Sequence, residues 1–214
     1  MQVFLETERL VLRRFTMADA DNLLGLDSDP DVMHFITGGR PTRRQDIVAD
    51  ILPAFLGYYE RFAGYGFWAA IEKSTGEFLG WFHFRPRDGS LPDQPELGYR
   101  LRKSAWGKGY GTEGSRALIR KGFTEFGVRR VFAETMAVHT ASRRVMEKAG
   151  LTLVRTFTQP WPYKIPGREH GDVEYALTRA GWEHQEAAGR EDRPGVAKAA
   201  AQGRPKDRPG QAEA

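Results

Sequence analysis

The sequence predicts an α/β domain in which a mixed β-sheet is covered by helices. Short runs of alternating apolar and polar residues predict strands, and longer runs with apolar residues at helical spacing predict helices. Along the chain, a β-hairpin precedes strands that alternate with helices, an order typical of mixed sheets with helical layers. The 214 residues suffice for one domain with a substantial core.

The first predicted elements are a strand over 9–15 and two helices over about 16–27 and 42–61. Each helix begins with a threonine that is followed three residues later by Asp or Gln, a pattern that resembles a capping box. Pro53 lies inside the second helix. We expect a kink or break there, because proline has no backbone N–H to donate and its ring clashes with the preceding turn.

The rest of the domain is predicted to contain six strands and two helices. The strands cover 66–73, 77–85, 96–101, 130–136, 151–158 and 172–178, and the helices cover 114–123 and 141–149. Ser74, Thr75 and Gly76 turn the first hairpin, and Gly150 ends the second helix. Glycine inside a strand commonly marks a bulge or a close approach, so Gly98 predicts a bulge in the strand over 96–101.

The last segment differs in composition from the domain. Beyond Trp182 there is no aromatic residue, and Ala, Gly, Pro and charged residues dominate. Such a segment cannot bury enough apolar surface to fold alone. We therefore expect a domain over 1–182 and a disordered tail over 183–214, helical at best just past residue 180.

Composition excludes several classes of site and partner. The chain has no cysteine, so disulfides, a thiolate nucleophile and cysteine-ligated metals are excluded, and its five histidines show no metal-ligand spacing. The tail holds six basic and six acidic residues, so the formal charge of +4 belongs to the domain. This excess suits a polyanionic cofactor and is too small to indicate nucleic acid. The lack of a signal peptide and of a long apolar run predicts a cytoplasmic protein with no membrane partner.

A glycine-rich run between a predicted strand and a predicted helix is the strongest functional signal. It comprises Trp106, Gly107, Lys108, Gly109, Tyr110, Gly111 and Thr112. Such a turn leaves backbone N–H groups unpaired at the positive end of the helix dipole, which suits a phosphate or pyrophosphate. The spacing matches neither the dinucleotide-binding pattern nor a P-loop.

A second segment about 30 residues further on completes a pattern that resembles the GNAT acetyltransferases. In that family, Arg/Gln-x-x-Gly-x-Gly/Ala binds the pyrophosphate of acetyl-CoA, and here Trp106 stands at the position of Arg or Gln. The family's Asn-x-x-Ser falls on 139–142, with His139 in place of Asn, and its Glu-Lys-x-Gly-Phe falls on 147–151. The resemblance covers about 7–180.

The openings of the chain and of its last strand resemble one branch of the family in particular. Thr-Glu-Arg-Leu-x-Leu-Arg over 7–13 and Asp-Val-x-x-Tyr over 172–175 are shared with the ribosomal-protein N-terminal acetyltransferases. The resemblance implies a three-layer sandwich with a twisted mixed sheet of about seven strands, whose two central parallel strands splay apart at the active site. It also implies acetyl-CoA as cofactor, with its pantetheine arm beside the backbone of Tyr99, Arg100 and Leu101, and in contact with His139.

In acetyl transfer to an amine a thiolate must leave, and because the pKa of a thiol is about 8.5, an acid that protonates it helps but is not obligatory. Many members of the family use a tyrosine beyond the second motif, but no tyrosine lies between Tyr110 and Tyr163. The branch that this chain resembles uses the motif serine, which Ser142 matches. An alternative is that Ser142 only caps the following helix.

The amine must also lose a proton, and three residues are candidates for the base. Glu96 begins the strand that precedes the glycine run, Glu134 lies in an apolar strand, and His139 replaces the motif asparagine. A buried glutamate is costly unless it is paired or functional, so Glu134 is either a base or a salt-bridged strand residue. For His139 we favour cofactor contact, and a chain of waters is a further alternative to a dedicated base.

The acceptor is expected to contact Trp161 and Tyr163 in the loop over 159–170. Aromatic residues elsewhere, and His83, are more often core, whereas Asp88, Asp93 and Asp172 are candidates to attract a cationic amine. The leading hypothesis is an acetyl-CoA-dependent N-acetyltransferase, monomeric or homodimeric, that moves acetyl directly to a primary amine (a protein N-terminus or a small amine) in a ternary complex. The alternative is a non-catalytic acyl-CoA-binding or regulatory module.

Overall fold

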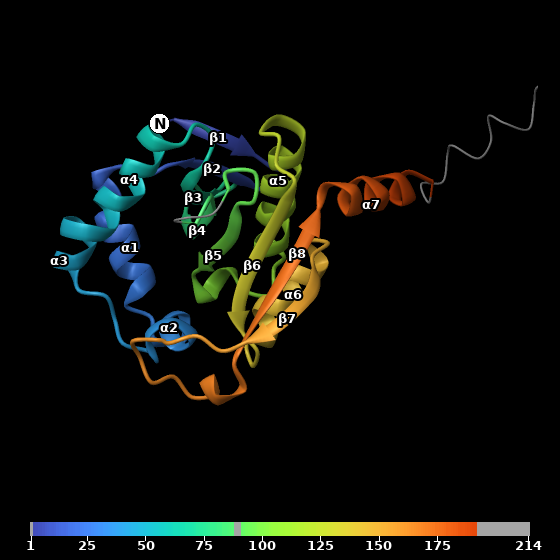
Figure 1. Ribbon diagram of the computed structural model, residues 1–214. Helices are drawn as coiled ribbons and strands as arrows, with labels where there is room; N and C mark the ends of the chain where they lie inside the picture. The colour runs from blue at the N-terminus through green and yellow to red at the C-terminus, as the bar shows by residue number, and fades with distance from the viewer. Residues whose placement is uncertain (1, 88–90, 192–214) are drawn as a thin grey trace, which may run out of the picture. The chain divides into compact units, whose positions relative to one another are not determined.

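The computed structural model describes residues 2–87 and 91–191, and the chain divides into two compact units, Met1–Arg179 and Ala180–Ala214. The first unit contains an eight-stranded sheet in the order β1-β2-β3-β4-β5-β6-β8-β7 (Figure 1). Its strands are β1 (Val3–Glu6), β2 (Leu10–Arg14), β3 (Gly66–Glu72), β4 (Phe78–Arg85), β5 (Glu96–Leu101), β6 (Arg130–Met136), β7 (Thr152–Phe157) and β8 (Asp172–Thr178). Its α-helices, in the described residues, are α1 (Ala20–Asp27), α2 (Pro30–Thr37), α3 (Arg44–Asp46), α4 (Leu52–Arg61), α5 (Tyr110–Glu125) and α6 (Thr140–Lys148).

The sheet consists of two antiparallel parts that meet at one parallel strand pair. Strands β1 to β5 pair in sequence order, and β6, β8 and β7 form the second part, all antiparallel. Between β5 and β6 the only registered pair is Glu96 with Phe132. Beyond Glu96, therefore, the edge of β5 that faces β6 is not occupied by a strand, which is the splay that the resemblance implies.

The mixed α/β fold with helices on a mixed sheet is confirmed, with eight strands where about seven were expected. The additional strand, β1, pairs with β2. Helix α2 was not predicted, although its signals are present: Asp29 accepts a hydrogen bond from the Asp31 amide at the N-cap, Pro30 begins the helix, and Gly38 ends it at φ 72°.

The irregularity expected near Pro53 is present just before it. A π-helical segment, Ile47–Ile51, separates α3 from α4, and Pro53 lies in the first turn of α4. The missing N–H and the bulk of the proline ring both act on the preceding turn.

The bulge predicted at Gly98 is wrong. Strand β5 pairs with β4 in unbroken register from Glu96 to Leu101, with Gly98 opposite His83. The glycine has a different cause: a Cβ built there would lie 2.5 Å from the His83 ring. Gly98 thus allows a side chain to approach the strand closely, and the His83 imidazole occupies the space that a Cβ would need.

Helices cover the two faces of the sheet (Figure 1). On one face, aromatic residues of β3 and β4 pack with α1, α2 and α4 in a buried cluster that includes Phe55, Phe67 and Trp81. On the opposite face, α5 approaches β4 closely, since a Cβ at Gly114 would lie 2.3 Å from the Phe82 ring and one at Gly122 would lie 2.5 Å from the Phe84 ring.

The second unit begins with helix α7 (Arg179–Glu191). The helix is longer than the short one that the sequence allowed just past residue 180, so the part of the tail up to residue 191 is helical rather than disordered. The rest of the tail, 192–214, lies outside the described residues. None of the helices in the described ranges combines the length and apolar character that crossing a membrane requires.

Candidate active site

The glycine-rich run forms a tight turn that leads into α5. Gly107 and Gly109 have φ of 72° and 87°, in the left-handed region that glycine adopts without strain, and Gly109 is the N-cap of α5. The first amides of a helix have no carbonyl partner within it, so those of Tyr110, Gly111 and Thr112 are directed out of the helix end. A Cβ at Gly107 would meet no atom within 4 Å, which leaves the turn open on that side.

Arg9 and Glu113 hold this turn in place, and sequence reasoning missed both. Arg9 donates to the Lys108 carbonyl at 2.9 Å and pairs with Glu113 at 2.6 Å. Glu113 also accepts hydrogen bonds from the Thr7 hydroxyl and the Arg9 amide, and the guanidinium lies 4.4 Å from the centre of the Tyr110 ring. Burial raises the pKa of Glu113, but these hydrogen bonds outweigh it and hold the pKa below its usual value. The shared Thr7–Arg13 opening was the available signal.

Trp106 does not replace the polar side chain, Arg or Gln, that the family has at its position. Its indole Nε1 donates to the Leu101 carbonyl at 2.8 Å, and the residue is 47% exposed. Because Nε1 is the only donor of an indole side chain, Trp106 has none left for a phosphate. Its ring and its backbone are what it can offer to a cofactor.

Neighbouring residues of β5 point their side chains to opposite faces of the sheet, as strand geometry requires. Arg100 extends toward α1, where it pairs with the buried Asp27 at 2.6 Å and lies over Trp81. The Arg100 side chain is therefore occupied, which leaves its backbone as the part that can contact a cofactor. Leu101 is buried.

Tyr99 extends to the other face and meets Ser142 of α6. The Tyr99 Oη lies 3.0 Å from the Ser142 carbonyl oxygen and 3.0 Å from the Ser142 Oγ. Burial raises the pKa of Tyr99, so its hydroxyl is protonated at neutral pH. The alternative that Ser142 caps α6 is wrong: the N-cap is His139, and the Ser142 hydroxyl faces Tyr99.

His139 lies at the junction of β6 and α6 and stacks on Phe35 of α2, with the ring centres 4.1 Å apart. Burial lowers the pKa of His139 to about 4, so the imidazole is neutral at neutral pH. It can therefore hydrogen bond to a neutral amide without carrying a charge.

The two glutamate candidates lie together where β5 and β6 separate, joined by Arg87. The guanidinium contacts Glu96 Oε1 at 2.7 Å, and it contacts Glu134 Oε1 and Oε2 at 3.2 and 2.9 Å. Glu134 is therefore salt-bridged, which the sequence analysis gave as the alternative to a catalytic base. Burial raises the pKa of Glu96. The charges around the carboxylate, including those of the Arg87 and Arg85 guanidinium groups, outweigh this effect and lower the pKa.

The second carboxylate oxygen of Glu96 faces His83. Glu96 Oε2 lies 3.8 Å from His83 Nε2 and 3.2 Å from Arg85 Nη2, with which it forms an ion pair. Glu96 Oε2 and His83 Nε2 are both buried without a hydrogen-bond partner among the described residues. Burial lowers the pKa of His83 to about 4, so its contact with Glu96 is not an ion pair at neutral pH. A carboxylate oxygen is a hydrogen-bond acceptor, and so is Nε2 in the imidazole tautomer that carries its hydrogen on Nδ1. In that tautomer the two acceptors face one another, which suits a donor such as an amine.

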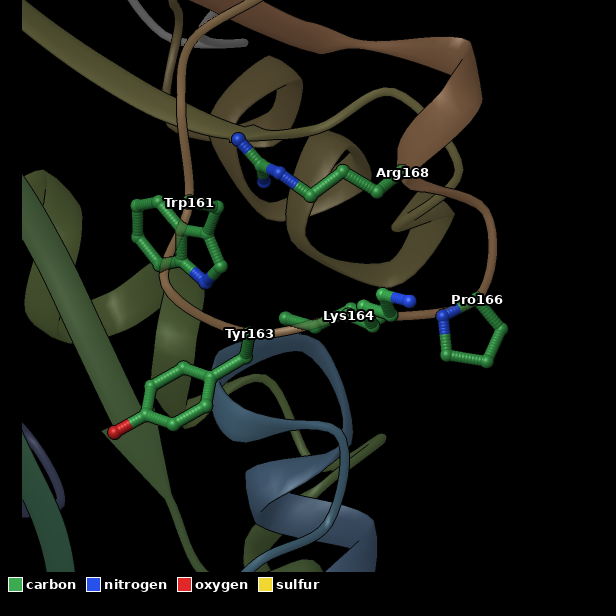
Figure 2. A pocket seen from close by; sticks show the side chains of 6 residues that line it. Trp161, Tyr163, Lys164, Pro166 and Arg168 are labelled. Atoms are coloured by element: carbon green, nitrogen blue, oxygen red, sulfur yellow. The ribbon is translucent and has the colours of Figure 1, made fainter.

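Trp161 and Tyr163 line a pocket of about 530 Å³ in the loop before β8 (Figure 2). They are 43% and 37% exposed. The Trp161 Nε1 donates to the Ile36 carbonyl of α2 at 3.1 Å. The other residues that line the pocket are Lys164, Ile165, Pro166 and Arg168.

Two of the three aspartates proposed to attract a cationic amine are already paired with arginines. Asp93 pairs with Arg129, and the buried Asp172 pairs with Arg168 at 2.7 Å. Asp88 lies outside the described residues. The structure thus brings together Tyr99 with Ser142 and Glu96 with Glu134, and it adds His83 and Arg87, which share no spacing pattern in the sequence.

Known proteins share both the sequence pattern and the fold. The acetyltransferase (GNAT) domain model matches residues 9–152. A curated relative from Aspergillus fumigatus, named FsC-acetyl coenzyme A-N(2)-transacetylase, is 34% identical over 187 residues, which are 85% of this chain and 78% of the relative.

Two solved structures show how far the shared fold extends. A GNAT-family acetyltransferase from Bacillus anthracis has a TM-score of 0.65 at 23% identity, covering 82% of this chain and 98% of that chain. An aminoglycoside acetyltransferase in complex with coenzyme A has a TM-score of 0.64 at 23% identity, covering 83% and 99%. With the domain match and the relative, they show that this chain belongs to the GNAT acetyltransferase family and is an N-acetyltransferase.

Proposed function

We propose that this protein binds acetyl-CoA and moves its acetyl group directly to a primary amine within a ternary complex. The observation that carries the proposal is the open glycine turn at the start of α5, which lies next to the strand edge that β5 leaves unpaired. Amides of 107–112 would hold the pyrophosphate. The backbone of Tyr99 to Leu101, with His139, would pair with the pantetheine arm. When bound, acetyl-CoA supplies an activated acetyl group on a thiolate that can leave.

Of the base candidates, Glu96 is the residue best placed to take a proton from the amine. Both oxygens of Glu134 hydrogen bond to Arg87, whereas Glu96 Oε2 has no hydrogen bond among the described residues, although it is ion-paired with Arg85 at 3.2 Å. The amine would donate to Glu96 Oε2 and to His83 Nε2, which orients its lone pair away from both. The proton then leaves from Glu96 to solvent, since the lowered pKa of Glu96 does not retain it.

Ser142 would protonate the departing thiolate, Tyr99 would replace that proton, and Tyr99 would regain its own proton from solvent before the next turnover. Tyr99 and Ser142 share a hydrogen bond of 3.0 Å. A hydroxyl that gives up its proton can take another from a donor to which it is already bonded. Tyr99 therefore supplies, from β5, the tyrosine that the family usually places beyond the second motif.

The name of one relative narrows the class of amine that we propose as the acceptor. The Aspergillus protein is named as an N(2)-transacetylase, which favours a small amine over a protein N-terminus for this chain as well. The alternative is the branch that acetylates ribosomal-protein N-termini, which the opening at 7–13 resembles.

Binding and turnover are tested separately. Acetyl-CoA should raise the melting temperature, because it binds only the folded chain, and a panel of amines should then release free thiol. Stabilisation without thiol release from any amine would instead support the non-catalytic acyl-CoA-binding module.

A glycine substitution tests the phosphate turn. Gly109→Val should abolish stabilisation by acetyl-CoA while the fold is retained, because the side chain is forced into a positive φ beside the amides. Gly76→Val is the matched control: Gly76 has φ 74°, lies in the β3–β4 turn and has no atom within 4 Å of its Cβ position. If Gly109→Val binds acetyl-CoA as well as Gly76→Val does, the turn is not the phosphate site.

A further inference from the structure

The pocket beside Trp161 adjoins the junction of β6 and α6, where His139 is proposed to contact the pantetheine arm. Trp161 donates to Ile36 in α2, and the preceding residue, Phe35, stacks on His139. On the other side of the loop, a Cβ at Gly167 would lie 2.7 Å from Val138, the residue before His139. The loop that lines the pocket thus packs against α2 and against the residue that precedes His139. The pocket is therefore placed to hold the part of the acceptor that does not react.

The side chains of the pocket are aromatic, apolar or cationic. The Arg168 guanidinium lies 4.7 Å from the centre of the Trp161 ring, and Ile165, which also lines the pocket, is buried. Figure 2 shows Arg168 reaching back toward Trp161, with Lys164 on the facing side, while the Tyr163 ring points away from the hollow between them. The aromatic and apolar side chains of the pocket suit an apolar part of an acceptor, and its cationic side chains suit an anionic group.

Two cations at this loop have no counter-charge within the described residues. Arg168 is neutralised by Asp172. Lys164 and Arg40, which lies 6.0 Å from the centre of the Tyr163 ring, have no ion pair in the part of the chain that the structure describes. A surplus of positive charge repels a polycationic acceptor such as a polyamine and attracts an anionic one.

The carboxylates near the reaction centre point to the same conclusion. Glu96 and Glu134 share Arg87, and Asp27 is bound by Arg100. Each of these carboxylates already has a guanidinium, so none is left over for a second ammonium group of a substrate. A single amine can still donate to Glu96 Oε2, which has no hydrogen bond among the described residues.

We propose that the acceptor is a small amine that also carries an anionic group, such as a carboxylate, which Lys164 binds in the pocket beside Trp161. The inference rests on the proposed function and names its substrate class. An anionic acceptor of this kind would distinguish this enzyme from an acetyltransferase whose substrate carries several amines.

Two acceptors that differ only in charge test the inference. An ω-amino acid and its carboxamide present the same amine on the same chain, and a diamine of equal length replaces the anion with a cation. With saturating acetyl-CoA, kcat/KM from thiol release should be about 10-fold or more higher for the acid than for the amide, as expected for a charged hydrogen bond. The diamine should be the poorest acceptor of the three.

Lys164→Gln should remove this preference. It should raise KM for the acid about 10-fold, leave kcat nearly unchanged, and leave the amide unaffected, because only the anion contacts the ammonium group. Lys148→Gln is the charge-matched control, since Lys148 is an exposed lysine at the other end of α6. Acetyl-CoA should stabilise both variants as it does the wild type.

The failures of the two proposals differ. If the amide, the diamine or a peptide N-terminus is acetylated as well as the acid, or if Lys164→Gln leaves the preference intact, the anionic acceptor is wrong while the acetyltransferase stands. If acetyl-CoA binds and no amine in the panel releases thiol, the proposed function itself fails, and this inference fails with it.

Discussion

At the scale of single residues, the hydrogens of the Tyr99–Ser142 pair decide what the pair can do. The Tyr99 hydroxyl has one hydrogen, and a carbonyl oxygen can only accept. With both contacts made, Tyr99 donates to the Ser142 carbonyl and Ser142 Oγ donates to Tyr99. Ser142 can give its proton to a thiolate if Tyr99 then turns its own hydrogen from the carbonyl to Oγ.

Substitutions of this pair should therefore act as one unit. Ser142→Ala should lower kcat by about 10²-fold, the scale of a general acid, with acetyl-CoA affinity near wild type. Tyr99→Phe should give a similar loss, and the double variant should be little worse than either single one. The measurement is kcat from thiol release together with the dissociation constant of acetyl-CoA.

A second buried serine provides the control for this prediction. Ser115 in α5 is fully buried, and its hydroxyl has no hydrogen-bond partner among the described residues. Ser115→Ala should leave kcat unchanged. Losses that add in the Ser142, Tyr99 double variant would show that the two hydroxyls act separately, and normal turnover in Ser142→Ala would leave solvent as the proton donor.

At the scale of elements, α5 is placed by glycines at its contacts with α6 and with the sheet. Gly111, in the first turn, would bring a Cβ within 3.4 Å of Val145 in α6, and Gly114 would bring one within 2.3 Å of Phe82 in β4. Gly111 therefore serves helix packing at least as much as phosphate approach, unlike Gly109 with its positive φ. The end of α5 reaches the cofactor turn because the helix can lie this close.

Gly114→Ala should accordingly destabilise the fold by about 1–3 kcal/mol, the usual cost of overpacking, and lower the melting temperature by several degrees. Alanine has a higher helix propensity than glycine, so the intrinsic propensity alone would stabilise the variant. Gly57→Ala in α4 isolates that preference, because no atom lies within 4 Å of its Cβ position. This control should be neutral or stabilising, and equal melting temperatures for the two variants would contradict the packing argument.

At the scale of the whole molecule, two buried neutral histidines make stability depend on pH. Burial lowers the pKa of His83 and of His139 to about 4, against about 6.5 in the unfolded chain. Between pH 6.5 and 4 the unfolded chain binds more protons than the folded one, so stability falls as pH is lowered through this window. The shift of about 2.5 in pKa corresponds to roughly 3 kcal/mol for each histidine.

The slope of the unfolding free energy with pH measures this effect. Urea titrations at pH 7, 5.5 and 4.5 should show stability falling steadily in the wild type, and His139→Gln should lower the slope. His170→Gln is the control, because His170 is exposed at the surface. If His139→Gln and the wild type have the same slope, His139 is not buried as a neutral group. Below this window the stabilisation from Glu96, whose folded pKa is lowered, is lost in turn.

Much of this protein could be predicted from the sequence, because the signals are local. Alternation of apolar residues marked the strands from β2 to β8, and the glycine run with its following helix indicated an anion site. These features depend on residues within a few positions of one another. A strand such as β1 could not be found in this way, because its four residues are half-buried or exposed and gain their partner only in β2.

The arrangement of the candidate site was decided by tertiary structure alone. Glu96 and Glu134 are 38 positions apart and looked equivalent as bases, yet Arg87 hydrogen bonds to both oxygens of Glu134 and to only one oxygen of Glu96. Tyr99 became a partner of Ser142, and Gly98 made room for His83, only when separate elements packed together. The physical reason is that backbone preferences are set by neighbours in the chain, whereas a proton acceptor is defined by which hydrogen bonds its surroundings leave unmade.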